Sequence, residues 1–209
     1  MKRTLFLLLL VIPLLCSCAK APVVIDRYQP VAKTANEKIE VQDNYLAIKN
    51  VDADHAITAM LSGAENIVIV YLKIENKTGL DLTAADYSVR LTDGLDRKPL
   101  QLISREMVME YRARVAVGDK IASGNAMVDL ALTQLENMAK TMGSTELAQF
   151  ITSIDWAIEH YFAFRPVYAN RSREGVLCYS VNFIREYPLT LEIKIKGKTI
   201  NFDFLPIKK

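Results

Sequence analysis

The chain has 209 residues, of which 51 % are apolar and 24 % charged, and its formal net charge is +2. This apolar content is enough for a sizeable core, and the length fits one domain or one domain with an insertion. Basic and acidic residues nearly balance and no basic block occurs, so the electrostatic footprint of a nucleic-acid-binding protein is missing.

The first segment has the layout of an export signal. Lys2 and Arg3 precede an apolar run from Leu5 to Leu15. That run is shorter than the roughly 20 residues that a membrane-spanning helix needs. We therefore expect a secretory signal and not a transmembrane helix.

The end of the run, Leu15-Cys16-Ser17-Cys18, resembles the signal of bacterial lipoproteins, with Cys16 where a small or β-branched residue is usual. The resemblance implies that residues 1–17 are removed and that Cys18 becomes the first residue and carries acyl groups such as palmitate. Two or more acyl chains give stable membrane anchoring. Because no Asp follows Cys18, the sorting rule of such lipoproteins points to the outer membrane, facing the periplasm. The alternative is an ordinary secretory peptide cleaved after Ser17 or Ala19.

Residues 18–35 are expected to form a tether between the anchor and the folded domain. Pro22 and Pro30 bracket an extended run that shows no helical period. At ~3.3 Å per residue, such a tether holds a domain up to about 50 Å from the bilayer. The alternative is that its apolar side chains dock on the domain or on a partner, namely Val23, Val24, Ile25 and Tyr28.

Strand patterns follow, and Ile67–Glu75 is the clearest of them. It is rich in β-branched residues, and its even-numbered positions form one apolar face. Apolar residues also begin the opposite face, so we expect this strand to start covered on both sides and to emerge at Lys73. Val41–Val51 is predicted as an earlier strand.

The secondary structure of two neighbouring segments is less clearly indicated by the sequence. Within Asp52–Gly63, either Ile57–Leu61 forms a strand or the aspartates cap a short helix through Ala56–Leu61 that ends at Gly63, and the short helix is slightly favoured. The alternating strand Tyr87–Leu91 ends at Asp93-Gly94, a hairpin signal, and Pro99–Ile103 is expected to return beside it.

The period changes to a helical one between about residues 105 and 163. Apolar residues recur at three- and four-residue steps on both sides of Gly143, which predicts two amphipathic helices joined as a hairpin. For Met107–Val117, the sequence allows either a further short helix or an extended strand end. The first stripe includes Leu132, Leu135, Met138 and Met142, and the second includes Phe150, Ile151, Ile154, Tyr161 and Phe162.

Strand patterning returns after Gly175. Val176–Ile184 is expected as one strand, followed by a final hairpin in which Leu189–Ile195 pairs with Ile200–Phe204 across a Lys196-Gly197-Lys198 turn. Turn-separated alternating strands predict an antiparallel two-sheet sandwich. With the helices between them, the fold class is α+β.

This strand pattern resembles the immunoglobulin-like (Ig-like) domains of bacterial envelope lipoproteins. The resemblance rests on Val70–Thr78, Tyr87–Leu91, the strand led by Gly175 and the closing hairpin. It implies an Ig-like β-sandwich domain over residues 36–209, with the helical insertion at about 105–163. The antibody-type cysteine pair is missing, because Cys178 has no intrachain partner once Cys16 is removed and Cys18 is acylated.

We searched for catalytic and metal-binding motifs and found none. His55 and His160 are far apart and have no neighbours at metal-ligand spacing, and His160 is expected to be exposed or interfacial. Asp93 and Asp96 lack the ligand count of a calcium site, so a simple turn is favoured. Cys178 lies in an apolar strand pattern and is expected to be a buried, inert thiol. We therefore predict no catalytic, cofactor or metal site and no enzymatic activity.

The predicted function is a structural or adaptor role in the cell envelope through protein–protein contacts. In one interpretation the helical hairpin covers the sandwich. In a second its methionines, including Met127, form a protein docking surface. In a third an apolar pocket between hairpin and sheet, lined by Phe150, Ile154 and Tyr161, binds a lipid or small molecule.

Overall fold

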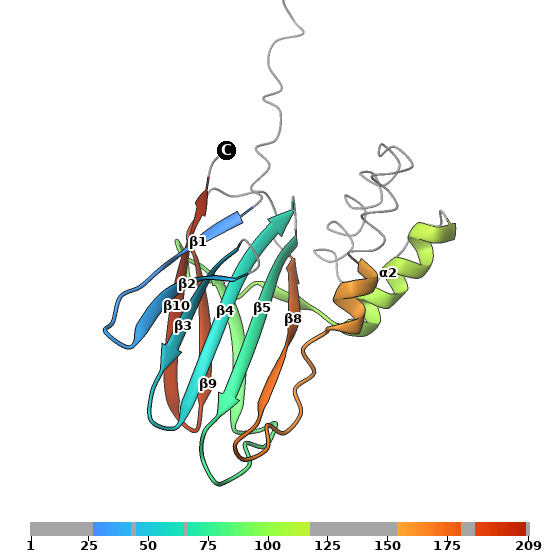
Figure 1. Cartoon of the computed structure of the whole chain (residues 1–209). Helices are drawn as coiled ribbons and strands as arrows, with labels where there is room; N and C mark the ends of the chain where they lie inside the picture. Colours follow the sequence, from blue (N-terminus) through green and yellow to red (C-terminus); the bar gives the residue numbers. More distant parts are fainter. Residues whose placement is uncertain (1–26, 43–44, 65–66, 118–153, 181–186, 208–209) are drawn as a thin grey trace, which may run out of the picture.

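The computed structural model describes residues 27–42, 45–64, 67–117, 154–180 and 187–207, and these residues form predominantly antiparallel β-structure (Figure 1). The elements are β1 (Arg27–Val31), β2 (Glu37–Gln42), β3 (Tyr45–Val51), β4 (His55–Ala64), β5 (Ile67–Asn76), β6 (Tyr87–Asp93), β7 (Gln101–Ile103), α2 (Arg105–Val117), β8 (Ser172–Ser180), β9 (Leu189–Ile195) and β10 (Lys198–Ile207).

The strands form two layers that are connected through β1. One hydrogen-bonded path runs in the order β6-β9-β10-β1-β4-β5-β8-β7, and β2 and β3 continue from β4. Strand β1 pairs along its whole length with β10 and pairs with β4 only at Arg27 and Ser62. In Figure 1, β9 and β10 lie behind β3, β4 and β5.

The main core lies between these layers. Its buried side chains come from strands of both layers, which shows that the layers pack face to face. The even-numbered residues of β5 from Val68 to Ile74 are at most 1 % exposed, as the alternation predicted. The core includes Ile57, Val70, Leu72, Leu91, Leu177, Leu191, Phe202 and Phe204.

A second, smaller core covers the outer face of β5 and β8. Val108 of α2 and Ile154 pack there with Val176 and Cys178, and Ile69 is half-buried against them. The prediction that β5 begins covered on both sides is therefore confirmed. Residues 154–159 are helical, and α2 settles the choice left open for Met107–Val117 in favour of a helix. Residues 118–153, which hold most of the predicted helical hairpin, lie outside the described residues.

The predicted short helix over Ala56–Leu61 is wrong, because this segment belongs to β4. Oδ1 of Asp52 accepts hydrogen bonds from the backbone N–H of Asp54 (2.8 Å) and of His55 (2.7 Å), so the aspartate stabilises a turn and no helix starts there. β4 pairs with β3 on one side and β5 on the other. This apolar, partly β-branched sequence suits a central strand, and pairing on both sides outweighs its helical propensity.

The tether predicted over residues 18–35 is wrong for Arg27–Val31, which forms β1 inside the sheet. Tyr28 is buried in the main core, as the docking alternative stated. The strand predicted over Val41–Val51 is also corrected: β2 and β3 are two strands, paired from Glu37 with Asn50 to Gln42 with Tyr45. Residues 18–26 lie outside the described residues.

The hairpin predicted after Asp93-Gly94 forms only in part. The chain turns back, and Pro99 bridges Thr92, but Gln101–Ile103 pairs with β8 in the other layer. The final hairpin is confirmed in full, with β9 and β10 paired from Ile195–Lys198 to Leu189–Phe204.

Candidate functional site

The base of the helical insertion is the first region where the sequence predicted function. Ile154 is 8 % exposed and packs in the second core. The hydroxyl of the half-buried Tyr161 donates a hydrogen bond to the carbonyl oxygen of Ile103 (2.8 Å), and burial raises the pKa of Tyr161 to about 12. Both side chains thus fasten the insertion to the sheet. Phe150, Met127, Met138 and Met142 lie outside the described residues.

The solvent side of this base exposes large apolar side chains. Met109 of α2 is 45 % exposed and Trp156 is 46 % exposed. The ring of Trp156 stacks on His160 with centroids 4.8 Å apart, and the exposure predicted for His160 is confirmed. Arg112 of α2 binds Asp155 through Nε and Oδ1 (2.7 Å), which connects the two helical segments.

The second region is a polar end of the sheet that the sequence did not single out. Here β4 begins at His55, β5 ends at Asn76, β8 begins at Ser172 and the β9–β10 turn reaches Lys198. The start of β1 lies near the opposite end of β4, since Arg27 pairs with Ser62. Seven residue steps along β4 separate His55 from Ser62, so at about 3.3 Å per residue the polar end lies roughly 23 Å from the start of β1.

Asn76 organises this end. It is 2 % exposed, and its side-chain amide nitrogen donates to the carbonyl oxygens of Leu80 (2.8 Å) and Val167 (3.1 Å). Its Oδ1 accepts hydrogen bonds from the backbone N–H (3.1 Å) and the hydroxyl (2.8 Å) of Thr78. The loop after β5 is thereby held against the segment that leads into β8.

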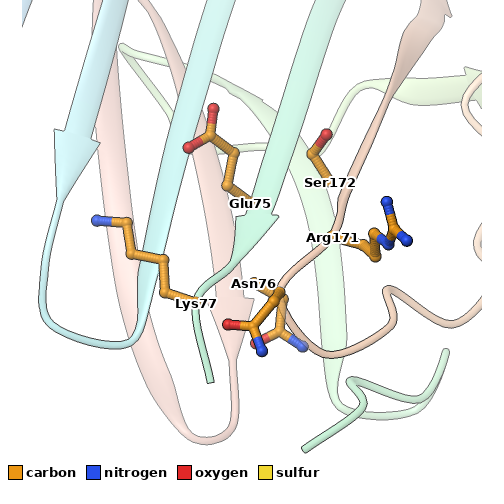
Figure 2. A pocket seen from close by; sticks show the side chains of 6 residues that line it. Glu75, Asn76, Lys77, Arg171 and Ser172 are labelled. Atoms are coloured by element: carbon orange, nitrogen blue, oxygen red, sulfur yellow. The ribbon is translucent and has the colours of Figure 1, made fainter. Parts of the chain in front are cut away.

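A shallow pocket of about 310 Å³ lies beside Asn76, and Figure 2 shows its polar lining. Glu75 forms an ion pair with Lys73 at 3.3 Å. The lining offers positive charges, amides and a hydroxyl but no imidazole or thiol, so its chemistry suits binding of a polar group. The lining residues are Glu75, Asn76, Lys77, Asn170, Arg171 and Ser172.

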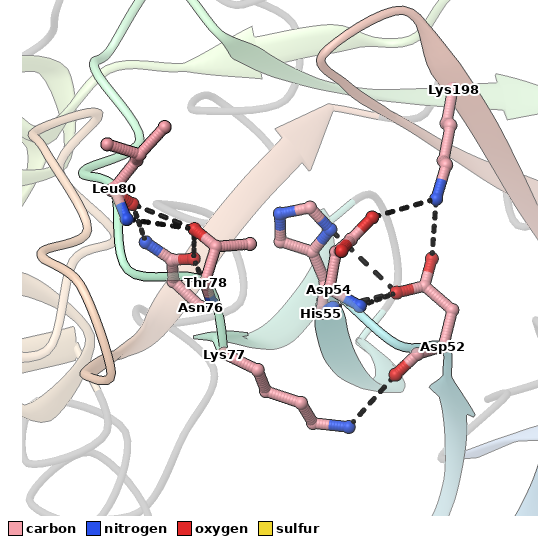
Figure 3. A network of polar contacts seen from close by, with 8 residues as sticks. All are labelled: Asp52, Asp54, His55, Asn76, Lys77, Thr78, Leu80 and Lys198. Carbon is pink, nitrogen blue, oxygen red and sulfur yellow. Dashed lines mark hydrogen bonds and ion pairs between the residues drawn. The ribbon is translucent and has the colours of Figure 1, made fainter.

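A second polar cluster adjoins the pocket and is centred on the turn before β4 (Figure 3). Lys198 Nζ contacts Oδ2 of Asp52 at 3.4 Å and Oδ2 of Asp54 at 3.3 Å. Burial opposes ionisation of Asp52, but the backbone hydrogen bonds and Lys198 outweigh it and lower the pKa of this carboxyl group. Lys77 Nζ donates to the backbone oxygen of Asp52 (3.1 Å).

The structure also places the remaining candidates. Cys178 is a free, buried thiol, as predicted, and burial raises its pKa to about 11. Oδ1 of Asp93 accepts a hydrogen bond from the backbone N–H of Leu95 (2.8 Å), and Asp96 forms an ion pair with Lys98, so these aspartates form a turn as expected. Cys18 lies outside the described residues.

The sequence analysis found no neighbours of His55 at metal-ligand spacing, but the structure brings two carboxylates close to it. Ligand atoms of Asp52, Asp54 and His55 lie within 4.8 Å of one another. The signal was present in the sequence as Asp52-Ala53-Asp54-His55, but assigning the aspartates as helix caps concealed it.

Comparisons with known proteins assign no family. A scan against protein-family models found no match, and a search of curated proteins found no significant similarity. Within the part of the chain that the structure describes, no helix has the length and apolar character needed to cross a membrane.

Proposed function

We propose that this protein is a lipid-anchored bacterial envelope lipoprotein that acts as a structural or adaptor subunit through protein–protein contacts. The observation that supports this most directly is the order of the N-terminal residues: a basic pair, a short apolar run and then Leu15-Cys16-Ser17-Cys18. In this proposal Cys18 carries the acyl chains, and the domain faces the periplasm from the outer membrane.

The folded part of the proposal is an Ig-like β-sandwich with an inserted helical hairpin. Two face-to-face antiparallel layers support the sandwich. Helix α2 and the helical residues 154–159 support an insertion, because both lie between β7 and β8 in the chain and pack together on the sheet. The proposed partner surface is the solvent side of this insertion, where Met109 and Trp156 are exposed.

The anchor is tested by membrane fractionation and labelling with a palmitate analogue in a bacterial host. Cys18→Ala should abolish labelling and release a folded domain from the membrane fraction. Cys178→Ala is the matched control, because Cys178 is buried in the fold, and this variant should stay labelled and anchored. Unchanged fractionation of Cys18→Ala would contradict the lipoprotein assignment.

The adaptor role is tested by photo-cross-linking in intact cells. A photoreactive residue at Met109 or Trp156 should give one discrete cross-linked species of higher mass. The same residue at Asn201, which is exposed on β10, should not. Equal, diffuse cross-linking from all three positions would reject the insertion as the partner surface.

A further inference from the structure

The turn before β4 places two carboxylates and an imidazole around one point in space. One ligand atom from each of Asp52, Asp54 and His55 lies within 4.8 Å of the others. Two backbone N–H groups fix Oδ1 of Asp52, at 2.8 and 2.7 Å, so this carboxylate is held in position. Oδ2 of each carboxylate faces the same ammonium group, that of Lys198. The two aspartates therefore already share a cation, as Figure 3 shows.

His55 supplies an observation that the carboxylates do not explain. The residue is 5 % exposed, and among the described residues its Nε2 has no hydrogen-bond partner. Nδ1 is directed at the cluster, 3.9 Å from Oδ1 of Asp52, which is beyond hydrogen-bond distance. Burial lowers the pKa of His55, and the nearby aspartates oppose this only in part. The side chain of His55 is thus buried beside the two carboxylates, with Nδ1 directed at them.

We propose that Asp52, Asp54 and His55 form a binding site for a divalent transition-metal cation such as Zn²⁺, and that Lys198 leaves the aspartates when the ion binds. A mixed set of imidazole nitrogen and carboxylate oxygens suits Zn²⁺, whereas Mg²⁺ and Ca²⁺ prefer oxygen ligands alone. Two carboxylates balance the charge of the ion. Water completes the coordination.

Lys198 can move away from the two aspartates. Its side chain is 57 % exposed, and ion pairs at such positions are weak, so the ammonium can move into solvent. Lys77 bonds the backbone oxygen of Asp52 and leaves both carboxylates accessible. Lys198 thus acts as a competitor for the metal. This inference does not depend on the lipid anchor or on the partner surface.

The test is titration of the full-length chain with ZnCl₂ alone, followed by NMR of the imidazole nitrogens. The chain contains only two histidines, so each imidazole is assigned by substitution, with His55→Gln and His160→Gln. We expect the Nδ1 resonance of His55 to shift and to saturate at one equivalent, with the resonances of His160 unchanged. Asp54→Asn should raise the Zn²⁺ concentration at the midpoint at least tenfold.

The decisive variant is Lys198→Gln, which should lower the midpoint concentration about three- to tenfold because the competing ammonium is gone. Asp54 is 52 % exposed, so its variant is expected to fold, and circular dichroism checks this. The proposal is overturned if the His55 resonances stay unmoved to 1 mM Zn²⁺ in both the unaltered protein and Lys198→Gln. It is equally overturned if Asp54→Asn leaves the midpoint unchanged, since His55 would then bind alone.

Discussion

Gly175 lies directly against the backbone of His160: a Cβ atom built on Gly175 would approach the carbonyl oxygen of His160 to 2.6 Å. This close approach exists because residues 160–162 run beside β8, where Val176 N–H donates to His160 O and Phe162 N–H donates to Val176 O, both at 2.8 Å. The chain leaving the helical insertion is therefore hydrogen-bonded to Val176, next to the glycine that allows the close approach.

Gly175→Ala should destabilise the protein by about 1–3 kcal/mol, because the added methyl group forces two hydrogen-bonded backbone segments apart. Urea unfolding measures the effect. Gly79→Ala is the matched control, since a Cβ there meets nothing within 4 Å, and its expected change is close to zero. Equal stability of the two variants would show that residues 160–162 do not lie against β8.

The strands that sequence analysis predicted well are those whose alternation matches burial on one face. In β9, Leu189, Leu191, Ile193 and Ile195 are buried, and the residues between them are more exposed. β4 was missed because Ala, Met and Leu favour helices as readily as strands, and only its pairing with β3 and β5 decides the outcome.

The polar end of the sheet was harder to foresee for a different reason. Its members come from four separate stretches of the chain, near residues 52–55, 76–80, 167–172 and 198. Strand register brings them together, as in the pairing of His55 with Asn76. No spacing rule within one segment contains that information, although Asp52-Ala53-Asp54-His55 gave a local indication.

Asn76→Ala should destabilise the protein by about 2–4 kcal/mol. The substitution removes the side-chain hydrogen bonds to the carbonyl oxygens of Leu80 and Val167 and both bonds to Thr78, all at a buried position. Thermal and urea unfolding check this, with Asn201→Ala at an exposed position of β10 expected to change stability by less than about 0.5 kcal/mol. A change as small as that of the control would contradict the role of Asn76 in joining the two loops.

Stability should fall at alkaline pH in part because of Cys178. Burial raises the pKa of its thiol from 9.0 to about 11, so the folded state retains a proton that the unfolded state has lost. This contribution is fully present below pH 9 and is lost as the pH rises through the range from 9 to 11. At pH 10 the loss is about 1.4 kcal/mol relative to pH 7.

Urea unfolding at pH 7 and pH 10 measures this loss, and Cys178→Ala isolates it. Buried tyrosines, including Tyr28 with a pKa of about 12, also weaken the fold at high pH, so both proteins become less stable. The decrease should be smaller by about 1.4 kcal/mol in Cys178→Ala. An identical decrease in both proteins would show that the thiol titrates normally in the folded state.

The turn between β9 and β10 offers a stabilising substitution. Lys196 and Gly197 both have positive φ, 46° and 83°, which is the type I′ geometry that favours Asn-Gly. Lys196→Asn should therefore raise the free energy of unfolding by about 0.5–1 kcal/mol, because Asn tolerates this backbone conformation better than Lys. Lys194→Asn on the neighbouring strand is the control and should be slightly destabilising, since Asn disfavours extended strands. A destabilised Lys196→Asn variant would mean that the hairpin does not close through a type I′ turn.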